Sequence, residues 1–234
     1  MKPKFRTLRE RWYHLTRAKY VSIGGVRLRA VGENIPDEIT RLLRRGDYEF
    51  AERHLLTQVA GPGDRVLEVG AGIGALGLVA AKICGAENVL SYEPNPATLP
   101  LIEANQAANG LHPVVRPKAI TTDGGPITFF RTGNIISSSL IERDASEAIS
   151  VESDTLDQAI LDFAPTILLM DAEGAELDLL PGSDLSSLRA IVVETHAKIT
   201  GAASVETLKA QLLAAGFAIK ADVNNNLLCV RADA

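Results

Sequence analysis

The sequence predicts an α/β fold, a doubly wound and largely parallel sheet covered by helices on both faces. Two observations carry this prediction. From residue 65 onward, short apolar runs of strand length alternate with stretches of helical periodicity. The first of these runs enters a glycine-rich turn from which a helix leaves. The length agrees, because 234 residues of which 46% are hydrophobic suffice for one core with an appendage.

The first twenty residues favour a basic amphipathic helix. They hold seven Lys or Arg side chains against a single acid, Glu10. Apolar residues recur there at helical spacing, at Phe5, Leu8, Trp12 and Leu15. Such a helix can lie on a membrane surface or hold an anionic partner. We favour a stripe that docks on its own domain or on a second subunit, as in a homo-oligomer.

The next forty residues complete a leading segment. One strand and two helices are expected there, over Val26–Val31, Pro36–Arg45 and Tyr48–Val59. A strong turn follows at Gly61-Pro62-Gly63-Asp64. We therefore expect residues 1–60 to form a helical segment that caps the domain or contacts a second subunit, and residues 61–234 to form the main domain.

Strands and helices then follow in regular order. Strands are expected over Arg65–Val69, Asn88–Glu93, Val114–Ile120, Thr166–Met170 and Ala190–Glu194, with a C-terminal hairpin of Phe217–Val223 and Leu227–Arg231. Helices are expected over Ala75–Ile83, Pro96–Ala108, Thr155–Phe163, Leu177–Leu180 and Val205–Ala215. Residues 121–153 are too long for a simple connection and predict an insertion on the substrate side, with a strand at Ile127–Phe130 and a polar loop at Ser137–Ser139.

Composition excludes several classes of protein. The formal net charge of −5 disfavours nucleic-acid partners. Two cysteines, Cys84 and Cys229, are too few for a disulfide framework or a cysteine-based zinc site. Apolar runs are shorter than the ~18 residues of a membrane span, and basic residues interrupt the N-terminus where a signal peptide would have its apolar core. A cytoplasmic protein without integral membrane segments is expected.

The most informative segment is Glu68-Val-Gly-Ala-Gly-Ile-Gly74. Glycines at 70, 72 and 74, with Ala71 between them, let the backbone turn tightly beside a ligand, and the following helix presents free amide groups. Nicotinamide, flavin and S-adenosylmethionine enzymes share this pattern. Glu93 ends the second strand, where an acid can accept hydrogen bonds from both ribose hydroxyls. Glu68, inside the first strand, suits a cationic cofactor. The alternative for Glu68 is a partly buried acid paired with a nearby base, and the alternative for Glu93 is a solvated strand end without a ligand.

The segment Glu68–Gly74 resembles motif I of class I S-adenosylmethionine-dependent methyltransferases, and the chain resembles the FkbM family in particular. Further motifs carry the likeness: Gly46-Asp-Tyr-Glu49, Tyr92-Glu-Pro-Asn-Pro96, Asn105-Gln-Ala-Ala-Asn-Gly110, Asp154-Thr-Leu-Asp157, Met170-Asp-Ala-Glu-Gly-Ala-Glu176 and Val193-Glu-Thr-His196. The resemblance implies a Rossmann-like, seven-stranded sheet whose last strand is antiparallel. It also implies O-methylation, often of sugar or polyketide hydroxyls, with S-adenosylmethionine bound by Glu68, Gly70, Ala71, Gly72, Gly74, Glu93, Pro94, Asn95 and Asp171.

Two positions stay open within this resemblance. Tyr48 and Glu49 either close over the methionine part of the cofactor or serve helix packing. Thr121-Thr122-Asp123-Gly124-Gly125 stands where many class I enzymes have an acid directly after the third strand, so Asp123 is only a provisional partner of the adenine amino group.

Candidate catalytic residues follow the fourth and fifth strands of the predicted main domain. Methyl transfer is an in-line displacement, and an alcohol acceptor must also lose a proton, which calls for a general base or a metal. His196 is the preferred base because its ordinary pKa is near neutrality. Glu173 is the second choice, and Asp171 is expected to orient the cofactor or the acceptor. Capping of a helix start is the alternative explanation for these acids.

A metal site is a weaker alternative. Asp171, Glu173, Glu194 and His196 are all able to bind Mg²⁺ or Mn²⁺, but their spacing does not force one site. We therefore do not expect a required metal. The predicted activity is methylation of a hydroxyl on a sugar or a polyketide-like secondary metabolite. The alternatives are a nicotinamide-dependent oxidoreductase, and a non-catalytic binding module with a vestigial cofactor site.

Overall fold

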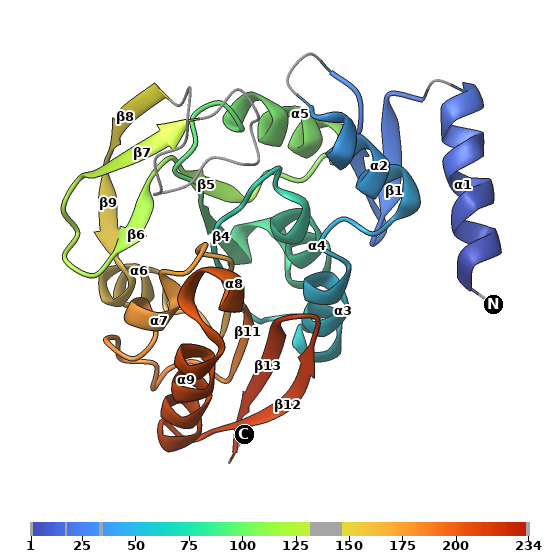
Figure 1. Cartoon of the computed structure of the whole chain (residues 1–234). Coiled ribbons are helices and arrows are strands. Elements are labelled where there is room, and N and C mark those ends of the chain that lie inside the picture. The colour runs from blue at the N-terminus through green and yellow to red at the C-terminus, as the bar shows by residue number, and fades with distance from the viewer. Residues whose placement is uncertain (1, 17, 33–34, 132–146, 233–234) are drawn as a thin grey trace.

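The computed structural model describes residues 2–16, 18–32, 35–131 and 147–232. In this part of the chain one sheet has seven strands in the order β12-β13-β11-β10-β3-β4-β5 (Figure 1). Their bounds are β3 Val66–Val69, β4 Val89–Tyr92, β5 Val114–Arg116, β10 Ile167–Met170, β11 Ala190–Glu194, β12 Phe217–Val223 and β13 Asn226–Arg231. Among them only β13 runs against the others. The predicted α/β fold, with its antiparallel last strand, is confirmed.

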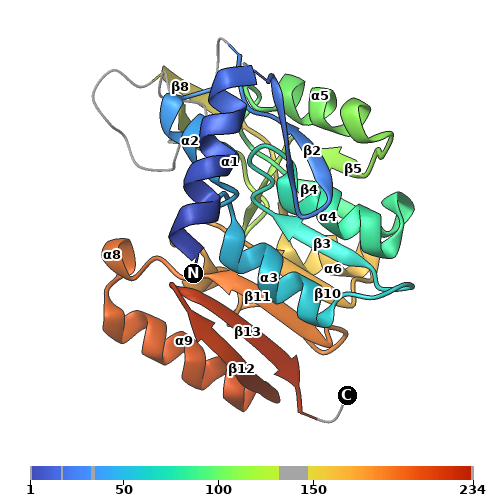
Figure 2. The same cartoon turned by 90° about the vertical axis from the view of Figure 1, so that its right-hand side faces the viewer.

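Helices cover both faces of this sheet, as Figures 1 and 2 show. Successive side chains of a strand point to opposite faces, and both faces here are apolar. Leu67 and Leu168 pack with α6 (Leu156–Phe163) and α9 (Ala202–Ala214). Val66 and Ile167 pack with α3 (Phe50–Val59) and α4 (Ala75–Cys84). Four shorter or peripheral helices follow the leading segment in the described part of the chain: η1 (Ala86–Asn88), α5 (Leu99–Asn109), α7 (Glu176–Leu179) and α8 (Ala197–Thr200).

The leading segment contains one element that the sequence analysis missed. Strand β2 (Val26–Arg29) was expected, but it pairs with a preceding strand, β1 (Tyr20–Ile23), in an antiparallel hairpin. Side chains of α5 hold this hairpin. Asn109 accepts from the amide of Arg27 and donates to its carbonyl, both at 2.7 Å, and Asn105 accepts from the amide of Arg29 at 2.7 Å. The hairpin is therefore hydrogen-bonded directly to the main domain.

Helix α1 (Lys2–Thr16) lies against α2 (Asp37–Arg45), as Figure 2 shows, and Glu10 pairs with Arg45 at 3.0 Å. Three residues of the apolar stripe face away from the domain, since Leu8, Trp12 and Leu15 are exposed by 61%, 57% and 81%. Docking on its own domain is therefore wrong for these three residues, and a second subunit stays a prediction. Among the described helices, none has the length and apolarity to cross a membrane.

The irregular stretch begins with a second correction. Val114–Ile120 is not one strand, because β5 ends at Arg116 and Pro117, which has no amide hydrogen, precedes a separate strand, β6 (Ala119–Thr121). Strand β6 pairs in parallel with β9 (Ser153–Thr155). The strand predicted near residue 127 is β7 (Ile127–Arg131), which pairs with β8 (Glu147–Val151). The loop Ser137–Ser139 lies outside the described residues.

Candidate active site

The glycine loop runs from Gly70 to Gly74, between β3 and α4. The amides of Gly70 and Ala71 both donate to the carbonyl oxygen of Tyr92, at 3.0 and 3.1 Å, which ties the loop to the end of β4. A Cβ on Gly70 would lie 2.1 Å from the carbonyl oxygen of Asp171, and φ at Gly70 is +90°. Only glycine fits there. Gly70 thus brings the loop against the first residue after β10.

Glu93 follows β4 directly and is built into this loop. Its Oε2 accepts from the amide of Gly72 at 2.6 Å, and its Oε1 accepts from the amide of Asn95 at 2.8 Å. Burial raises the pKa of Glu93 to about 7, because the nearby acids Glu68 and Asp171 add to the burial and the two amides only partly offset it. Half-buried Pro94 and buried Asn95 continue the turn, and the Asn95 side chain accepts from the amide of Ala97 at 3.0 Å.

Glu68 lies behind the loop rather than in it. Its Oε1 accepts from the amide of Gly77 in α4 at 3.0 Å, and the hydroxyl of Ser91 donates to its Oε2. The side chain is buried, and burial raises its pKa to about 7 even though both hydrogen bonds favour the charged form. The structure therefore places this acid beneath the loop, bound to α4 and β4, and any role of Glu68 in cofactor binding stays a prediction.

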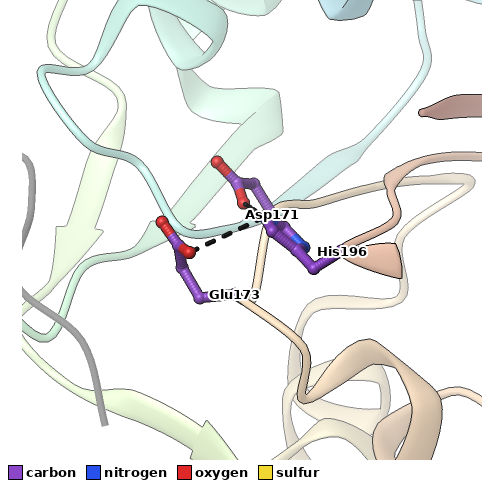
Figure 3. A group of neighbouring side chains, drawn as sticks. All are labelled: Asp171, Glu173 and His196. Carbon is purple, nitrogen blue, oxygen red and sulfur yellow. Dashed lines mark ion pairs between the residues drawn. The ribbon is translucent and has the colours of Figure 1, made fainter. Parts of the chain in front are cut away.

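A second set of polar side chains gathers where β10 and β11 end. These strands are parallel neighbours with Met170 beside Val193, so the residues that follow them reach the same edge of the sheet. The Nε2 atom of His196 lies 3.4 Å from Asp171 Oδ1 and 3.7 Å from Glu173 Oε2. Figure 3 shows these three side chains facing one another. The structure thus joins the three predicted catalytic residues in one cluster.

Glu176 fixes the orientation of this histidine. Its Oε1 accepts from the backbone amide of His196 at 3.0 Å and lies 3.1 Å from the ring Nδ1. Its Oε2 accepts from the amide of Gly174 at 2.8 Å. Glu176 is buried, and although burial alone would raise its pKa, the histidine and the amides hold that pKa below its usual value. An ionised Glu176 directs the opposite nitrogen, Nε2, towards Asp171 and Glu173.

The protonation of the cluster follows from its charges. Burial lowers the pKa of His196, but the hydrogen bond to Glu176 and the charges of Asp171 and Glu173 outweigh it and bring the value to about 9. Burial raises the pKa of Asp171 to about 6, because His196 offsets only part of the burial and of the repulsion from Glu173. Within the described residues, the buried Oδ1 of Asp171 accepts no hydrogen bond.

One further acid, Glu52, joins this edge from α3 and lies beside Glu194 at the end of β11. Burial, the charge of Asp171 and a hydrogen bond with Glu52 together raise the pKa of Glu194 to about 8. Glu194 was expected at this edge, whereas Glu52 was missed. The available signal was its spacing, since Glu52 lies three residues after Glu49 and so on the same helical face. The carboxylate of Asp123 accepts from the amide of Gly125 within its own exposed turn, at 3.0 Å, and its role as a partner of the adenine amino group stays a prediction.

With this geometry in place, the comparisons with known proteins decide the family. A family model described as the methyltransferase FkbM domain matches residues 68–218. The chain belongs to the FkbM methyltransferase family. The match includes the glycine loop, Glu93, Asp171, Glu173 and His196, and it begins after the leading segment.

One solved structure supports the fold of this FkbM methyltransferase, and a second is similar at a lower TM-score. A protein from Streptococcus mutans, assigned as a SAM-dependent methyltransferase, is 10% identical with a TM-score of 0.51, over 90% of this chain and 54% of that chain. A precorrin-6y C5,15-methyltransferase from Geobacter metallireducens is 12% identical with a TM-score of 0.48, over 76% of this chain and 85% of that chain. The search among curated proteins gives no match. At 10% identity, the likeness to the Streptococcus mutans protein concerns the fold alone.

The FkbM cluster also has the donor set of a metal site. Asp171, Glu173 and His196 each offer one ligand atom, and these atoms lie within 4.8 Å of one another. Carboxylate oxygens with one imidazole nitrogen suit Mn²⁺ or, less well, Mg²⁺. A protonated His196 already places one positive charge 3.4 Å from Asp171 and 3.7 Å from Glu173, which offsets part of their negative charge without a metal. The donor set therefore fits a divalent cation without requiring one.

Proposed function

We propose that this FkbM-family protein is an S-adenosylmethionine-dependent methyltransferase that methylates a hydroxyl group of a sugar or of a polyketide-like secondary metabolite. One observation carries the proposal. His196, oriented by Glu176, directs Nε2 into a polar cluster that lies against the glycine loop, because Gly70 packs on the carbonyl of Asp171. A group able to accept a proton therefore lies next to the loop where a methyl donor would bind.

Charge favours S-adenosylmethionine over a nicotinamide dinucleotide. Acids converge on the loop and on the strand ends beside it, and several have raised pKa values: Glu49, Glu68, Glu93, Asp171 and Glu194. Such a surface attracts a ligand with a sulfonium and an ammonium group, and it repels a pyrophosphate. S-adenosylmethionine supplies a methyl group made electrophilic by its positive sulfur. We assign its contacts to Gly70, Ala71, Gly72, Gly74, Glu93, Pro94 and Asn95, with Glu68 acting from behind and Asp171 at the methyl end.

The acceptor side then has a defined task. Bound S-adenosylmethionine would give its methyl group to the acceptor oxygen by in-line displacement, with S-adenosylhomocysteine as the leaving group, and the hydroxyl would have to lose its proton. Neutral His196 receives that proton at Nε2, while Glu176 holds Nδ1 and stabilises the resulting imidazolium. Asp171 and Glu173 orient the hydroxyl. We assign the rim of this side to residues 121–131 and 147–153, because β6 follows the carboxyl end of β5, where ligands bind in doubly wound sheets.

Calorimetric titration with S-adenosylmethionine, S-adenosylhomocysteine and NADH tests the cofactor. The same titrations are made on Glu93→Ala and on a matched control, Glu103→Ala, whose acid is exposed on α5. We expect the first two ligands to bind the wild type and the control with micromolar affinity, and Glu93→Ala to lose that binding. Binding of NADH alone, or of none of the three ligands, would overturn the proposal.

Transfer itself is then tested with a panel of sugars and polyketide-like alcohols against amines of matched size. Methylation of an alcohol supports the assignment of O-methylation. Methylation of amines alone would refute it while leaving the cofactor assignment intact.

A further inference from the structure

The turn between α2 and α3 lies directly over the glycine loop. If Gly72 carried a Cβ, that atom would be 3.2 Å from the hydroxyl oxygen of Tyr48 and 3.7 Å from Oε1 of Glu49. Gly72 is also the residue whose amide donates to Glu93. The two side chains of the turn and the acid after β4 therefore meet at the same loop residue, although they are more than forty positions apart in the sequence.

The backbone at Glu49 is strained and firmly held. Its φ of +46° lies in the left-handed region, which is unfavourable for a residue with a Cβ. Arg53 stabilises this conformation, because its Nε donates to the carbonyl of Tyr48 and its Nη2 to that of Gly46, both at 3.0 Å. Arg53 is itself buried. Strain that the surrounding structure maintains in this way is typical of ligand contacts.

The carboxylate of Glu49 is incompletely paired. Its Oε2 is buried and accepts no hydrogen bond from any residue that the structure describes. Burial raises its pKa well above the usual value, and the charges of Glu68, Glu52 and Asp171 raise it further, although a hydrogen bond with Tyr48 acts in the opposite direction. A buried oxygen without a donor, surrounded by acids, is costly unless a positively charged donor reaches it.

We infer that Glu49 binds the ammonium group at the amino-acid end of the methyl donor, with Tyr48 closing the same subsite over Gly72. An ammonium rather than the sulfonium is assigned because the unpaired Oε2 needs an N–H donor, and a sulfonium has none. This inference rests on the proposed function. It gives the positive-φ turn a role in binding and makes the Gly46–Glu49 motif part of the cofactor site.

A series of three ligands tests it. S-adenosylmethionine has both cations, S-adenosylhomocysteine keeps only the ammonium, and 5′-deoxy-5′-methylthioadenosine has neither. Each is titrated into the wild type, Glu49→Gln and the control Glu38→Gln, whose acid is exposed on the neighbouring α2. We expect Glu49→Gln to weaken the first two ligands equally, by about 10- to 100-fold, and to leave the third unchanged.

The other outcomes are equally clear. If Glu49→Gln weakened the binding of S-adenosylmethionine alone, Glu49 would contact the sulfonium instead. If Glu49→Gln bound each of the three ligands as tightly as the wild type does, Glu49 would be a packing residue. Either result overturns the inference. If the wild type binds none of the three, the proposed function fails instead. Thermal unfolding controls for misfolding. Because Glu49→Gln removes a buried acid that lies close to other acids, we expect its unfolding temperature at pH 8 to be at least that of the wild type.

Discussion

Glu93 and Asp171 occupy equivalent places at the edge of the sheet, but their carboxylates have different hydrogen-bond partners. Each follows a buried parallel strand at the same edge, after β4 and β10. Both oxygens of Glu93 accept from backbone amides of the loops around it. Asp171 has one buried oxygen without a hydrogen bond from the described residues, and its close neighbours are the titratable side chains of His196 and Glu173. The proposed cofactor side is held by backbone amides, whereas the proposed acceptor side is held by side chains whose charge depends on pH.

The largest expected effect comes from breaking the contact between these two regions. Gly70→Ala would place a methyl group against the carbonyl of Asp171, so we expect it to lower the free energy of unfolding by more than about 3 kcal/mol. Gly63→Ala is the matched control, because Gly63 has the same φ of +90° with nothing within 4 Å. Left-handed strain alone predicts a loss of about 1 kcal/mol there. Urea unfolding measures both, and equal losses would show that the contact is unimportant.

The second prediction concerns the acceptor side alone. His196→Gln should lower kcat/KM by about 10²- to 10⁴-fold, while His112→Gln, at an exposed histidine, should not. The protonated imidazolium cannot accept a proton, so in the wild type kcat/KM should rise with pH up to about 9, the pKa of His196. A rate that is already constant above about pH 6 would instead identify Asp171, whose pKa is about 6, as the base.

The third prediction tests the backbone-held side. The folded-state pKa of Glu68 is raised from 4.5 to about 7, so the folded protein binds more protons than the unfolded chain across this interval. The contribution of Glu68 to stability therefore falls as pH rises from about 4.5 to about 7. Glu68→Gln removes this loss, and we expect it to gain about 3 kcal/mol at pH 8 and almost nothing at pH 4. Urea unfolding of the wild type and Glu68→Gln at pH 4 and pH 8 tests this prediction. A gain in the free energy of unfolding that is the same at both pH values would contradict the raised pKa of Glu68.

The smallest effect is expected from removing divalent cations. Protonated His196 already faces Asp171 and Glu173, so an excess of EDTA should change the transfer rate by less than about twofold. The rate is measured before and after chelation, and again after Mg²⁺ or Mn²⁺ is added back. A loss that Mn²⁺ restores would show that the three ligand atoms hold a metal during turnover.

The contrast also explains what the sequence could predict. The glycine loop and Glu93 were readable because a backbone site leaves its mark as glycines at fixed spacing between a strand and a helix. The convergence of Asp171, Glu173 and His196 was readable from strand ends. Glu52 was not, because it reaches the site from a helix outside the βα repeat, and strand β1 was not, because four residues carry little periodicity. Pro117 was a visible signal that the strand predicted over Val114–Ile120 is divided in two, but the apolar residues on either side of it led to the prediction of one continuous strand.

Asn105 connects the leading hairpin to the glycine loop, and this has an evolutionary consequence. Its side-chain oxygen accepts from Arg29 in β2, and its side-chain nitrogen donates to the carbonyl of Ile73 at 2.9 Å. A lineage that lost the hairpin would leave the oxygen of a fully buried asparagine without its donor, one hydrogen bond away from the cofactor loop. Although the family match begins only at Glu68, the hairpin and the loop should be inherited together, and a chimaera of two such enzymes should be joined before Tyr20 rather than before β3.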